Sequence, residues 1–186
     1  MRKLKLQMQT SLDSFVSGIN GNEFGINWDD ESKEYSVANL EDVDNVLLGR
    51  KTAVDFIPYW RTAGSKPGNP DYLFGKTVSA VPPVIFSNTL KPSEAHGAEI
   101  INGDIVDGVN KLKNRDGKSI LVYGGVGFVS SLIKHGLVDE YHLLVNPVAL
   151  GNGVPIFNAL DNNLQLKLVI AKQLASGTVI LCYHKT

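Results

Sequence analysis

The amino-acid sequence predicts an α/β fold in which a mixed, mostly parallel sheet is flanked by helices and ends in an antiparallel hairpin. Short apolar runs typical of buried strands alternate along the chain with segments whose apolar residues recur every three or four positions, as they do in helices. The C-terminal region departs from this alternation, because two strand-like segments follow one another across the turn Ser176-Gly177. A length of 186 residues fits one domain that spans 1–186.

The first predicted elements lie in the N-terminal third of the chain. Leu4, Leu6 and Met8 alternate with polar residues and so share one face of a strand. The segment 29–40 is predicted to be a helix, because its acidic first turn suits the positive end of a helix dipole. The elements that follow are a buried strand (45–49), a helix (51–60) and a surface loop between helices (63–71).

The pattern continues through the rest of the chain. In a predicted helix over 104–113, Ile105, Val109 and Leu112 form one apolar stripe. The other predicted elements are strands over 83–87, 119–123 and 141–148, a helix that opens at 124–127 and ends at Gly136, and a hairpin with strands around 164–170 and 179–183. Because a tight turn joins the last two strands, we expect them to be antiparallel at one end of the sheet.

The composition excludes several classes of protein. With 18 Lys+Arg against 19 Asp+Glu the formal net charge is -1, so we expect no nucleic-acid partner. No apolar run reaches the ~18 residues that a membrane helix needs, and the N-terminus lacks the apolar core of a signal peptide. The single cysteine, Cys182, cannot form an internal disulfide. We therefore expect a cytoplasmic protein with no membrane partner.

Several familiar catalytic motifs are missing. Gly75-Lys76-Thr77 and Gly117-Lys118-Ser119 lack the glycine that a phosphate-binding P-loop requires five residues earlier. No Gly-x-Ser-x-Gly elbow occurs, which argues against an α/β-hydrolase. The histidines, at 96, 135, 142 and 184, show no metal-binding spacing. We therefore expect no metal site and interpret each histidine as packed or exposed to solvent.

One segment has the composition of an anion-binding site. The strand over 119–123 runs directly into Gly124, Gly125 and Gly127, where a helix begins. Glycine lets a phosphate approach the backbone closely, and the first N–H groups of a helix carry a partial positive charge. The pattern is not the full Gly-x-Gly-x-x-Gly dinucleotide motif, because Ser130 stands in the third position. Close packing of a helix on a strand would explain the same glycines equally well.

Two further segments favour the phosphate-site interpretation. Gly49-Arg50-Lys51-Thr52 follows a strand and combines a glycine, two cations and a hydroxyl at a helix start. Ser87-Asn88-Thr89 follows another strand with three small polar side chains. Ligands of open α/β sheets lie beyond the carboxyl ends of the strands, so these segments and 124–128 would meet around one extended ligand. A dinucleotide fits this arrangement better than a small metabolite does.

Taken in order, these segments resemble a known family. The matching motifs are Ser11-Leu12-Asp13, Gly49-Arg50-Lys51-Thr52, Ser87-Asn88-Thr89-Leu90, Tyr123-Gly124-Gly125, Leu137-Val138-Asp139-Glu140 and the segment 146–153, NPVALGNG. The chain is similar to the dihydrofolate-reductase-like superfamily, and within it to the reductase domain of the bifunctional deaminase-reductases of riboflavin biosynthesis and their stand-alone relatives. The resemblance covers nearly the whole chain and implies a dihydrofolate-reductase-like fold without a fused deaminase.

The resemblance implies an NADPH-dependent reductase that forms a homodimer and acts on a pteridine- or pyrimidine-like heterocycle, such as a ribosylamino-uracil phosphate. The residues that it assigns to NADPH are Gly49, Arg50, Lys51, Thr52, Ser87, Asn88 and Thr89, together with Gly124, Gly125, Val126, Gly127 and Phe128 in the glycine turn and the following helix. Ser11, Leu12 and Asp13 would lie near the nicotinamide. Two positions depart from the family, since Ser14 replaces a common glycine and Asn88 replaces a common cation. The second change weakens the preference for NADPH over NADH.

Hydride transfer from a nicotinamide to a carbonyl or imine carbon needs a nearby proton donor. The candidate catalytic carboxylates are Asp13 and Asp29, and Trp28 is the candidate wall for stacking a heteroaromatic substrate. Each carboxylate also has a structural interpretation, Asp13 as a turn residue and Asp29 at a helix N-terminus. Two other functions stay open, a dinucleotide-binding module without catalysis and dihydrofolate reductase itself.

Overall fold

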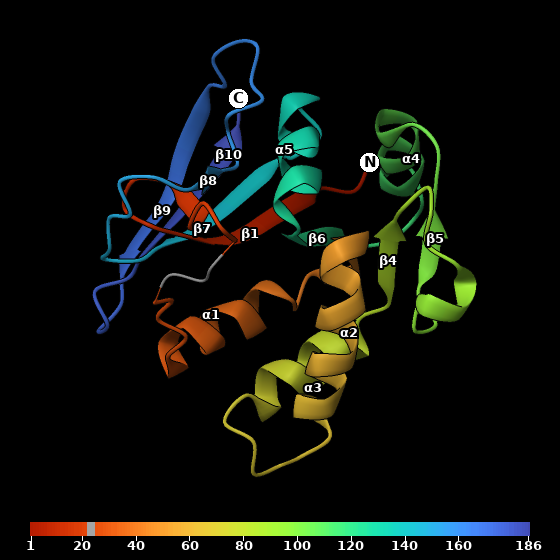
Figure 1. The fold of residues 1–186 in the computed structure, drawn as a ribbon, viewed down its shortest axis with the longest axis horizontal. Helices are drawn as coiled ribbons and strands as arrows, with labels where there is room; N and C mark the ends of the chain where they lie inside the picture. The colour runs from red at the N-terminus through yellow and green to blue at the C-terminus, as the bar shows by residue number, and fades with distance from the viewer. Residues whose placement is uncertain (22–24) are drawn as a thin grey trace.

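Parallel strands and a C-terminal antiparallel pair form the central sheet of the protein. The computed structural model describes residues 1–21 and 25–186, and its main sheet has eight strands in the order β5-β4-β3-β6-β1-β7-β10-β9 (Figure 1). The parallel strands, in sheet order, are β5 (Glu99–Ile101), β4 (Pro83–Phe86), β3 (Val43–Gly49), β6 (Ser119–Gly124), β1 (Leu4–Thr10) and β7 (Glu140–Val145). The antiparallel strands are β10 (Val179–Lys185) and β9 (Leu166–Gln173). The predicted mixed, mostly parallel sheet with its C-terminal hairpin is confirmed.

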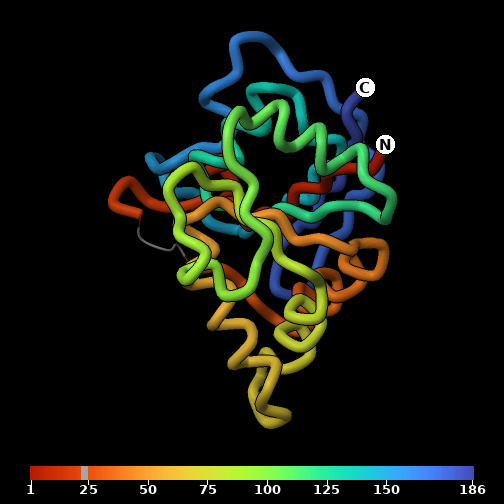
Figure 2. The backbone as a smooth tube through the Cα atoms, turned by 90° about the vertical axis from the view of Figure 1, so that its right-hand side faces the viewer, coloured from red at the N-terminus to blue at the C-terminus, as the bar shows by residue number. Residues whose placement is uncertain are grey.

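Helices cover both faces of this sheet. The elements on one face are α1 (Asp30–Asn39), α2 (Arg50–Gly64) and α3 (Tyr72–Ala80), and those on the other are α4 (Ile105–Lys113) and α5 (Val126–Lys134), as Figure 1 shows. Side chains alternate along each strand and so separate two apolar cores. In β3, Leu47 packs with the core under α4 and α5, whereas Val46 and Leu48 pack toward α2 and α3. Figure 2 shows α2 and α3 projecting beyond the sheet with their connecting loop.

Some predicted boundaries differ from the structure for local reasons. β7 ends at Val145 rather than at residue 148, because the side chain of Asn146 bonds to the carbonyl of Leu144 at 3.2 Å and Pro147 follows. Glu99, a charged residue at the edge of the sheet, begins β5, where it pairs with Arg115 at 2.6 Å. The elements too short for a sequence pattern are β5, β2 (Phe15–Ser17), β8 (Val154–Pro155) and the 3-10 helix Pro92–Glu94.

α1 docks on the sheet mainly through polar side chains. Its buried residues are Ser32, Ser36 and Asn39. Gln7 in β1 joins two of them, because its Nε2 donates to Ser36 Oγ at 2.7 Å and its Oε1 accepts from Asn39 Nδ2 at 2.8 Å. Asp29 caps the helix by accepting from the backbone N–H of Ser32. Since hydrogen bonds are directional, these contacts fix the position of α1 along β1.

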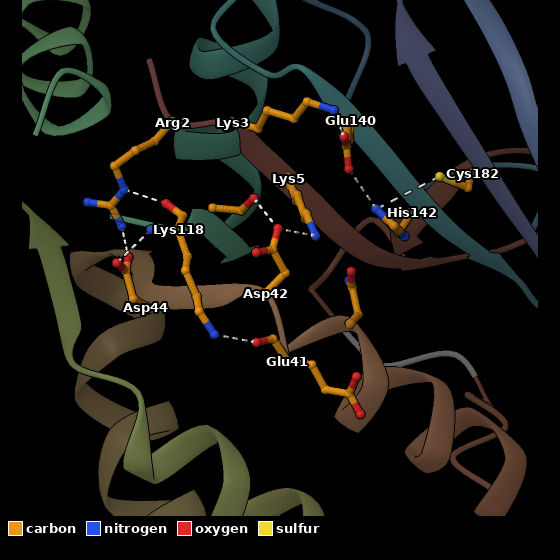
Figure 3. A network of polar contacts seen from close by, with 12 residues as sticks. Arg2, Lys3, Lys5, Glu41, Asp42, Asp44, Lys118, Glu140, His142 and Cys182 are labelled. Carbon is orange, nitrogen blue, oxygen red and sulfur yellow. Dashed lines mark hydrogen bonds and ion pairs between the residues drawn. The ribbon is translucent and has the colours of Figure 1, made fainter. Parts of the chain in front are cut away.

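Ion pairs tie together the amino ends of the parallel strands (Figure 3). Arg2 pairs with Asp44, and Lys3 Nζ lies 2.6 Å from Glu140 Oε1. Buried His142 approaches the other oxygen of Glu140 at 3.6 Å, so this histidine is packed, one of the two environments expected. The hydrogen bond to His142, and then the contact with Lys3, lower the pKa of Glu140 to about 2, although burial opposes them. The charged groups at the amino ends of the strands therefore pair with one another. The carboxyl ends of β3 and β6 differ, because glycine-rich turns follow them.

Candidate active site

The carboxyl ends of the parallel strands bring the predicted cofactor segments to one edge of the sheet. β3 lies between β4 and β6, with Leu48 paired to Gly124 and Gly49 paired to Phe86. The segments that continue from these strands are 49–52, 87–89 and 124–128. Because neighbouring parallel strands end at the same edge, these segments begin side by side.

Glycines allow a close contact where β3 and β6 end. A Cβ added to Gly49 would lie 2.9 Å from Phe128 Cβ and 3.4 Å from the backbone nitrogen of Gly125. A Cβ added to Gly125 would lie 2.8 Å from Thr52 Oγ1. The peptide bond between Gly124 and Gly125 is cis. We call these five residues the glycine-lined contact: Gly49, Thr52, Gly124, Gly125 and Phe128. It joins the starts of α2 and α5.

The N-termini of α2 and α5 carry no side-chain caps. Their N-cap residues are Gly49 and Gly125, and neither helix has an acidic residue in its first turn. By contrast, the carboxylates of Asp29 and Asp104 cap α1 and α4. The first N–H groups of α2 and α5 are therefore free of carboxylate partners and suit an anion such as a pyrophosphate. Exposed Arg50 and Lys51 add positive charge beside them; both belong to α2.

The segment after β4 forms a tight turn against the segment after β5. Ser87 Oγ accepts from the backbone N–H groups of Thr89 at 3.2 Å and Leu90 at 3.0 Å. Asn88 Oδ1 accepts from the backbone N–H of Gly103 at 2.6 Å. These bonds occupy Ser87 and Asn88, while Thr89 remains exposed at the surface. The turn therefore has its own hydrogen bonds, and its exposed groups are those that a ligand would meet.

The sheet opens between β1 and β6 at the same edge. These strands pair over only three residues, and their ladder ends at Leu6 and Val122. Beyond that point β1 stays paired with β7 as far as Thr10, whereas β6 stays paired with β3 as far as Gly124. The chain leaves β1 toward β3 and leaves β6 toward β7, in opposite directions across the sheet. Ligands of α/β sheets bind at such a switch point.

Asp13 is exposed, but its carboxylate is engaged with the protein. It accepts from Ser11 Oγ at 2.6 Å and from the backbone N–H groups of Leu150 at 3.0 Å and Gly151 at 2.7 Å. These bonds, that from Ser11 first among them, lower the pKa of Asp13 to about 2. A carboxylate that is ionised at neutral pH has no proton to donate. In the structure Asp13 is an anchor between the segment after β1 and the loop after β7, and its catalytic role stays a prediction.

Asp29 lies at the N-terminus of α1, close to the end of β7. Its Oδ1 accepts from the backbone N–H of Ser32 at 2.8 Å. Burial acts to raise the pKa of Asp29, but hydrogen bonds from Ser176 and Ser32 outweigh it and hold the pKa below its ordinary value. The backbone N–H of nearby Asn27 donates to Asn146 Oδ1, just beyond β7, at 2.8 Å. Asp29 is therefore an ionised hydrogen-bond acceptor beside the carboxyl edge.

Trp28 packs into an aromatic cluster rather than standing free as a wall. Its ring meets Phe74 edge-on with centroids 5.1 Å apart and lies 6.1 Å from Trp60. Its indole N–H donates to Asp71 Oδ1 at 3.1 Å. Tyr123, which directly precedes the glycine turn, contacts Phe74 at 6.1 Å and so belongs to the same cluster. Trp28 thus holds α2 and α3 against the segment before α1.

Sequence reasoning missed a group of amide side chains at this edge. Asn146 is fully buried, and its Nδ2 donates to Gln9 Oε1 at 2.9 Å and to the carbonyl of Thr10 at 3.1 Å. Its Oδ1 accepts from Asn27. The sequence did contain a signal for these amides, namely the glutamines Gln7 and Gln9 on the polar side of the first strand. In the structure this strand lies between β6 and β7 and under α1, so its polar side is covered and its amides need partners inside the protein.

Two classes of feature, membrane-spanning helices and metal-binding clusters, are absent from residues 1–21 and 25–186. No helix in these residues is long and apolar enough to cross a membrane. No group of three or more His, Cys, Asp or Glu side chains there is arranged to hold a metal ion.

Comparison with known proteins places this arrangement in a family. The chain is 33% identical over 186 residues to the uncharacterized protein YyaP of Bacillus subtilis (strain 168), a match that covers 98% of this chain and 95% of YyaP. The crystal structure of a putative riboflavin biosynthesis protein from Shewanella sp. PV-4 superposes with a TM-score of 0.70 at 22% identity, covering 99% of both chains.

Two more solved structures share the fold. The diaminohydroxyphosphoribosylaminopyrimidine deaminase/5-amino-6-(5-phosphoribosylamino)uracil reductase of Thermotoga maritima matches all of this chain and 57% of its own, with a TM-score of 0.68 at 16% identity. The match to a dihydrofolate reductase from Enterococcus faecalis, complexed with NADP(H), covers 99% of this chain and 96% of the reductase chain, with a TM-score of 0.61 at 14% identity. The dihydrofolate-reductase-like fold is therefore confirmed. Because residues 2–180 also match the family described as the RibD C-terminal domain, the protein belongs to that family.

Proposed function

We propose that the protein is an NADPH-dependent reductase that transfers hydride to a carbonyl or imine carbon of a pyrimidine- or pteridine-like heterocycle, including ribosylamino-uracil phosphates. One observation carries the proposal. The uncapped N-termini of α2 and α5 meet at the glycine-lined contact, beside the opening between β1 and β6. Membership of the RibD C-terminal domain family and likeness to a dihydrofolate reductase complexed with NADP(H) support it.

The residues of this edge fit a dinucleotide. The first N–H groups of α5, at Val126 and Gly127, suit the pyrophosphate, because Gly125 at the N-cap has no side chain to cap them. Arg50 and Lys51 are the cations that suit an adenosine 2′-phosphate. When bound, the nicotinamide supplies the hydride, and the chain supplies binding, orientation and exclusion of water.

Within this proposal the two predicted catalytic carboxylates have different tasks. Asp13 holds the loop after β7 through Leu150 and Gly151. Asp29, ionised and beside the carboxyl edge, accepts a hydrogen bond from the substrate or from the water that delivers the proton.

Cofactor oxidation tests the proposal directly. Purified protein is mixed with NADPH or NADH and a panel of acceptors that includes uracil derivatives, pterins and dihydrofolate, and the absorbance near 340 nm is followed. We expect turnover with NADPH and a heterocyclic acceptor. Turnover with dihydrofolate alone would identify a dihydrofolate reductase instead. Tight NADPH binding without turnover on any acceptor would favour a binding module without catalysis.

The cofactor preference is tested at Arg50. We expect Arg50→Ala to raise the Kd for NADPH about tenfold or more, because a charged hydrogen bond to phosphate is lost, and to change the Kd for NADH much less. Lys111→Ala, which removes an exposed cation from α4, is the matched control and should leave both constants unchanged. Equal losses for the two cofactors would remove Arg50 from the 2′-phosphate site.

A further inference from the structure

Two buried polar atoms at the opening have no hydrogen-bond partner. Among the described side chains, the buried atoms without one are Gln9 Nε2, Tyr123 OH and Tyr141 OH. Folded proteins pair nearly all of their buried polar groups, so each exception calls for an explanation. The first two atoms belong to β1 and β6, the strands that separate at the carboxyl edge.

Gln9 and Tyr123 lie on the same face of the sheet. Gln9 shares a face of β1 with Gln7, two residues earlier, which bonds to α1. Tyr123 stacks on Phe56 of α2 with ring centroids 5.4 Å apart. Tyr141 differs, because it belongs to the core on the opposite face, under α4 and α5.

The pairing of β1 with β6 places the two residues close together. Leu6 and Val122 are the last pair, and Tyr123 follows it by one residue and Gln9 by three. With strands about 4.8 Å apart at that pair and a rise of about 3.3 Å per residue, the two Cα atoms lie at least roughly 8 Å apart, since the strands separate beyond the pair. Two long side chains across this distance can both reach one small ring.

The orientation of the Gln9 amide follows from its neighbours. The backbone N–H of Asn27 can only donate, so the atom of Asn146 that it meets is Oδ1. Asn146 Nδ2 therefore points the other way, toward the carbonyls of Thr10 and Leu144 and toward Gln9. Gln9 must accept that bond with Oε1, which leaves both N–H groups of its Nε2 unused. A flipped amide would break this chain of bonds.

The Tyr123 hydroxyl is held in its neutral form. Burial raises its pKa well above the ordinary value, so the group stays protonated and can donate or accept a hydrogen bond. Its ring is fixed between Phe56 and Phe74. Both Tyr123 OH and Gln9 Nε2 are shielded from solvent and belong to the two strands that separate at the carboxyl edge.

We propose that Gln9 Nε2 and Tyr123 OH together bind the polar edge of the heterocyclic substrate. This inference rests on the proposed function and defines its substrate class, a ring with a carbonyl oxygen or ring nitrogen that accepts from Gln9 and a neighbouring polar atom that pairs with Tyr123. The amide edges of uracil-type and pterin-type rings have this character. A simple aldehyde or an apolar acceptor would leave one or both groups unpaired and would bind less well.

Two substitutions test the inference without disturbing the fold. Tyr123→Phe removes only a hydroxyl that has no partner, whereas Gln9→Leu removes the unpaired Nε2 together with the Oε1 that accepts from Asn146 Nδ2. We expect each to raise the KM for the heterocyclic acceptor about tenfold, with the Kd for NADPH within about twofold of wild type. The melting temperature should stay the same or rise for Tyr123→Phe, because that change removes a buried group that lacks a partner, and should fall for Gln9→Leu, which also breaks the bond from Asn146. Tyr141→Phe, which removes the unpaired hydroxyl on the opposite face, is the matched control and should leave KM unchanged.

Binding is also measured without turnover, by calorimetric titration of 5-aminouracil and of pterin into the full-length protein with NADP+. We expect both variants to weaken binding about tenfold and Tyr141→Phe to leave it unchanged. Unchanged KM and affinity in both variants overturn the inference, as does a lower melting temperature in Tyr123→Phe, since that result means that the hydroxyl pairs inside the protein. Binding of neither ring by wild type overturns it too. Failure of wild type to bind any nicotinamide cofactor overturns the proposed function, and the titration without cofactor still decides the roles of Gln9 and Tyr123.

Discussion

Asp13 and Ser14 are adjacent in the segment after β1, yet different physical requirements act on them. Asp13 is fixed by the donors around its carboxylate, which come from Ser11 and from the loop after β7. Ser14 is fixed by its backbone, because a φ of 67° lies in the left-handed region that favours glycine. The motif Ser11-Leu12-Asp13 shows which residues stand here, but neither the donors from the loop nor the backbone angle of Ser14 can be inferred from it.

Ser14→Gly should stabilise the protein. A non-glycine residue in the left-handed region costs about 1–2 kcal/mol, and the greater chain entropy of glycine offsets part of the gain. We expect the free energy of unfolding to rise by about 0.5–1 kcal/mol and the melting temperature by roughly 1–4 °C. Scanning calorimetry measures this change. Ser79→Gly in α3 is a control of opposite sign, since glycine lowers the stability of a regular helix; a loss of stability in both variants would contradict the prediction.

Asp13→Asn should lower activity without changing its pH dependence. The pKa of Asp13 is about 2 in the folded protein against 3.8 ordinarily, so its carboxylate contributes stability above pH 3.8 that is lost as the pH falls through 2. Between about pH 5 and pH 9 the group stays ionised, and the substitution should reduce kcat/KM by the same factor throughout. Loss of one limb of the pH–rate profile in the variant would instead return Asp13 to proton transfer.

At the scale of elements, an acidic first turn predicted α1, and apolar patterns predicted the long strands, α4, α5 and the C-terminal hairpin. They failed for elements such as β2 and β5, whose three residues contain no period. They also could not show how α1 docks, because serine and asparagine on a helix look like a solvated face. The convergence of 49–52 with 124–128 was predictable from parallel strand ends, whereas the opening between β1 and β6 depends on sheet register.

Gly49→Ala tests the glycine-lined contact. The added Cβ would lie 2.9 Å from Phe128 Cβ, an atom that α5 holds in place, so one helix start must shift. We expect the free energy of unfolding to fall by about 1–3 kcal/mol and NADPH binding to weaken with it. Urea denaturation and cofactor titration measure the two effects. Gly68→Ala, in the loop between α2 and α3 where nothing lies within 4 Å of the new Cβ, should change neither. An unaffected Gly49→Ala protein would mean that the contact is loose.

At the scale of the whole molecule, the two edges of the sheet differ. One edge is β5, which is three residues long and carries the ion pair between Glu99 and Arg115. The other edge is β9, eight residues long (Figure 1). Its central residues Leu168, Val169 and Ile170 are exposed by 49%, 49% and 42%. A long apolar edge strand is a template for pairing with another chain. We propose that two copies pair through β9, which gives the homodimer expected from the family resemblance a specific location.

Light scattering on the purified protein tests this assembly. We expect the mass of two chains for wild type and of one chain for a variant that carries both Leu168→Lys and Ile170→Lys, because charges on an edge strand oppose pairing. Leu73→Lys on α3, which replaces another exposed leucine, should remain dimeric. A monomeric wild-type protein would leave β9 without this role.

The polar docking of α1 affects how the protein responds to temperature. Separation of α1 from β1 would expose amides and hydroxyls, notably Gln7, Ser36 and Asn39, together with the apolar surface of Tyr35 and Val37. Because polar groups make up much of this contact, its heat-capacity change should be smaller than that for α5, which rests on apolar side chains. Hydrogen–deuterium exchange should therefore show a shallower denaturant dependence for α1 amides than for α5 amides. The helix that Asp29 caps would then stay docked on β1 in the cold, where hydrophobic contacts weaken.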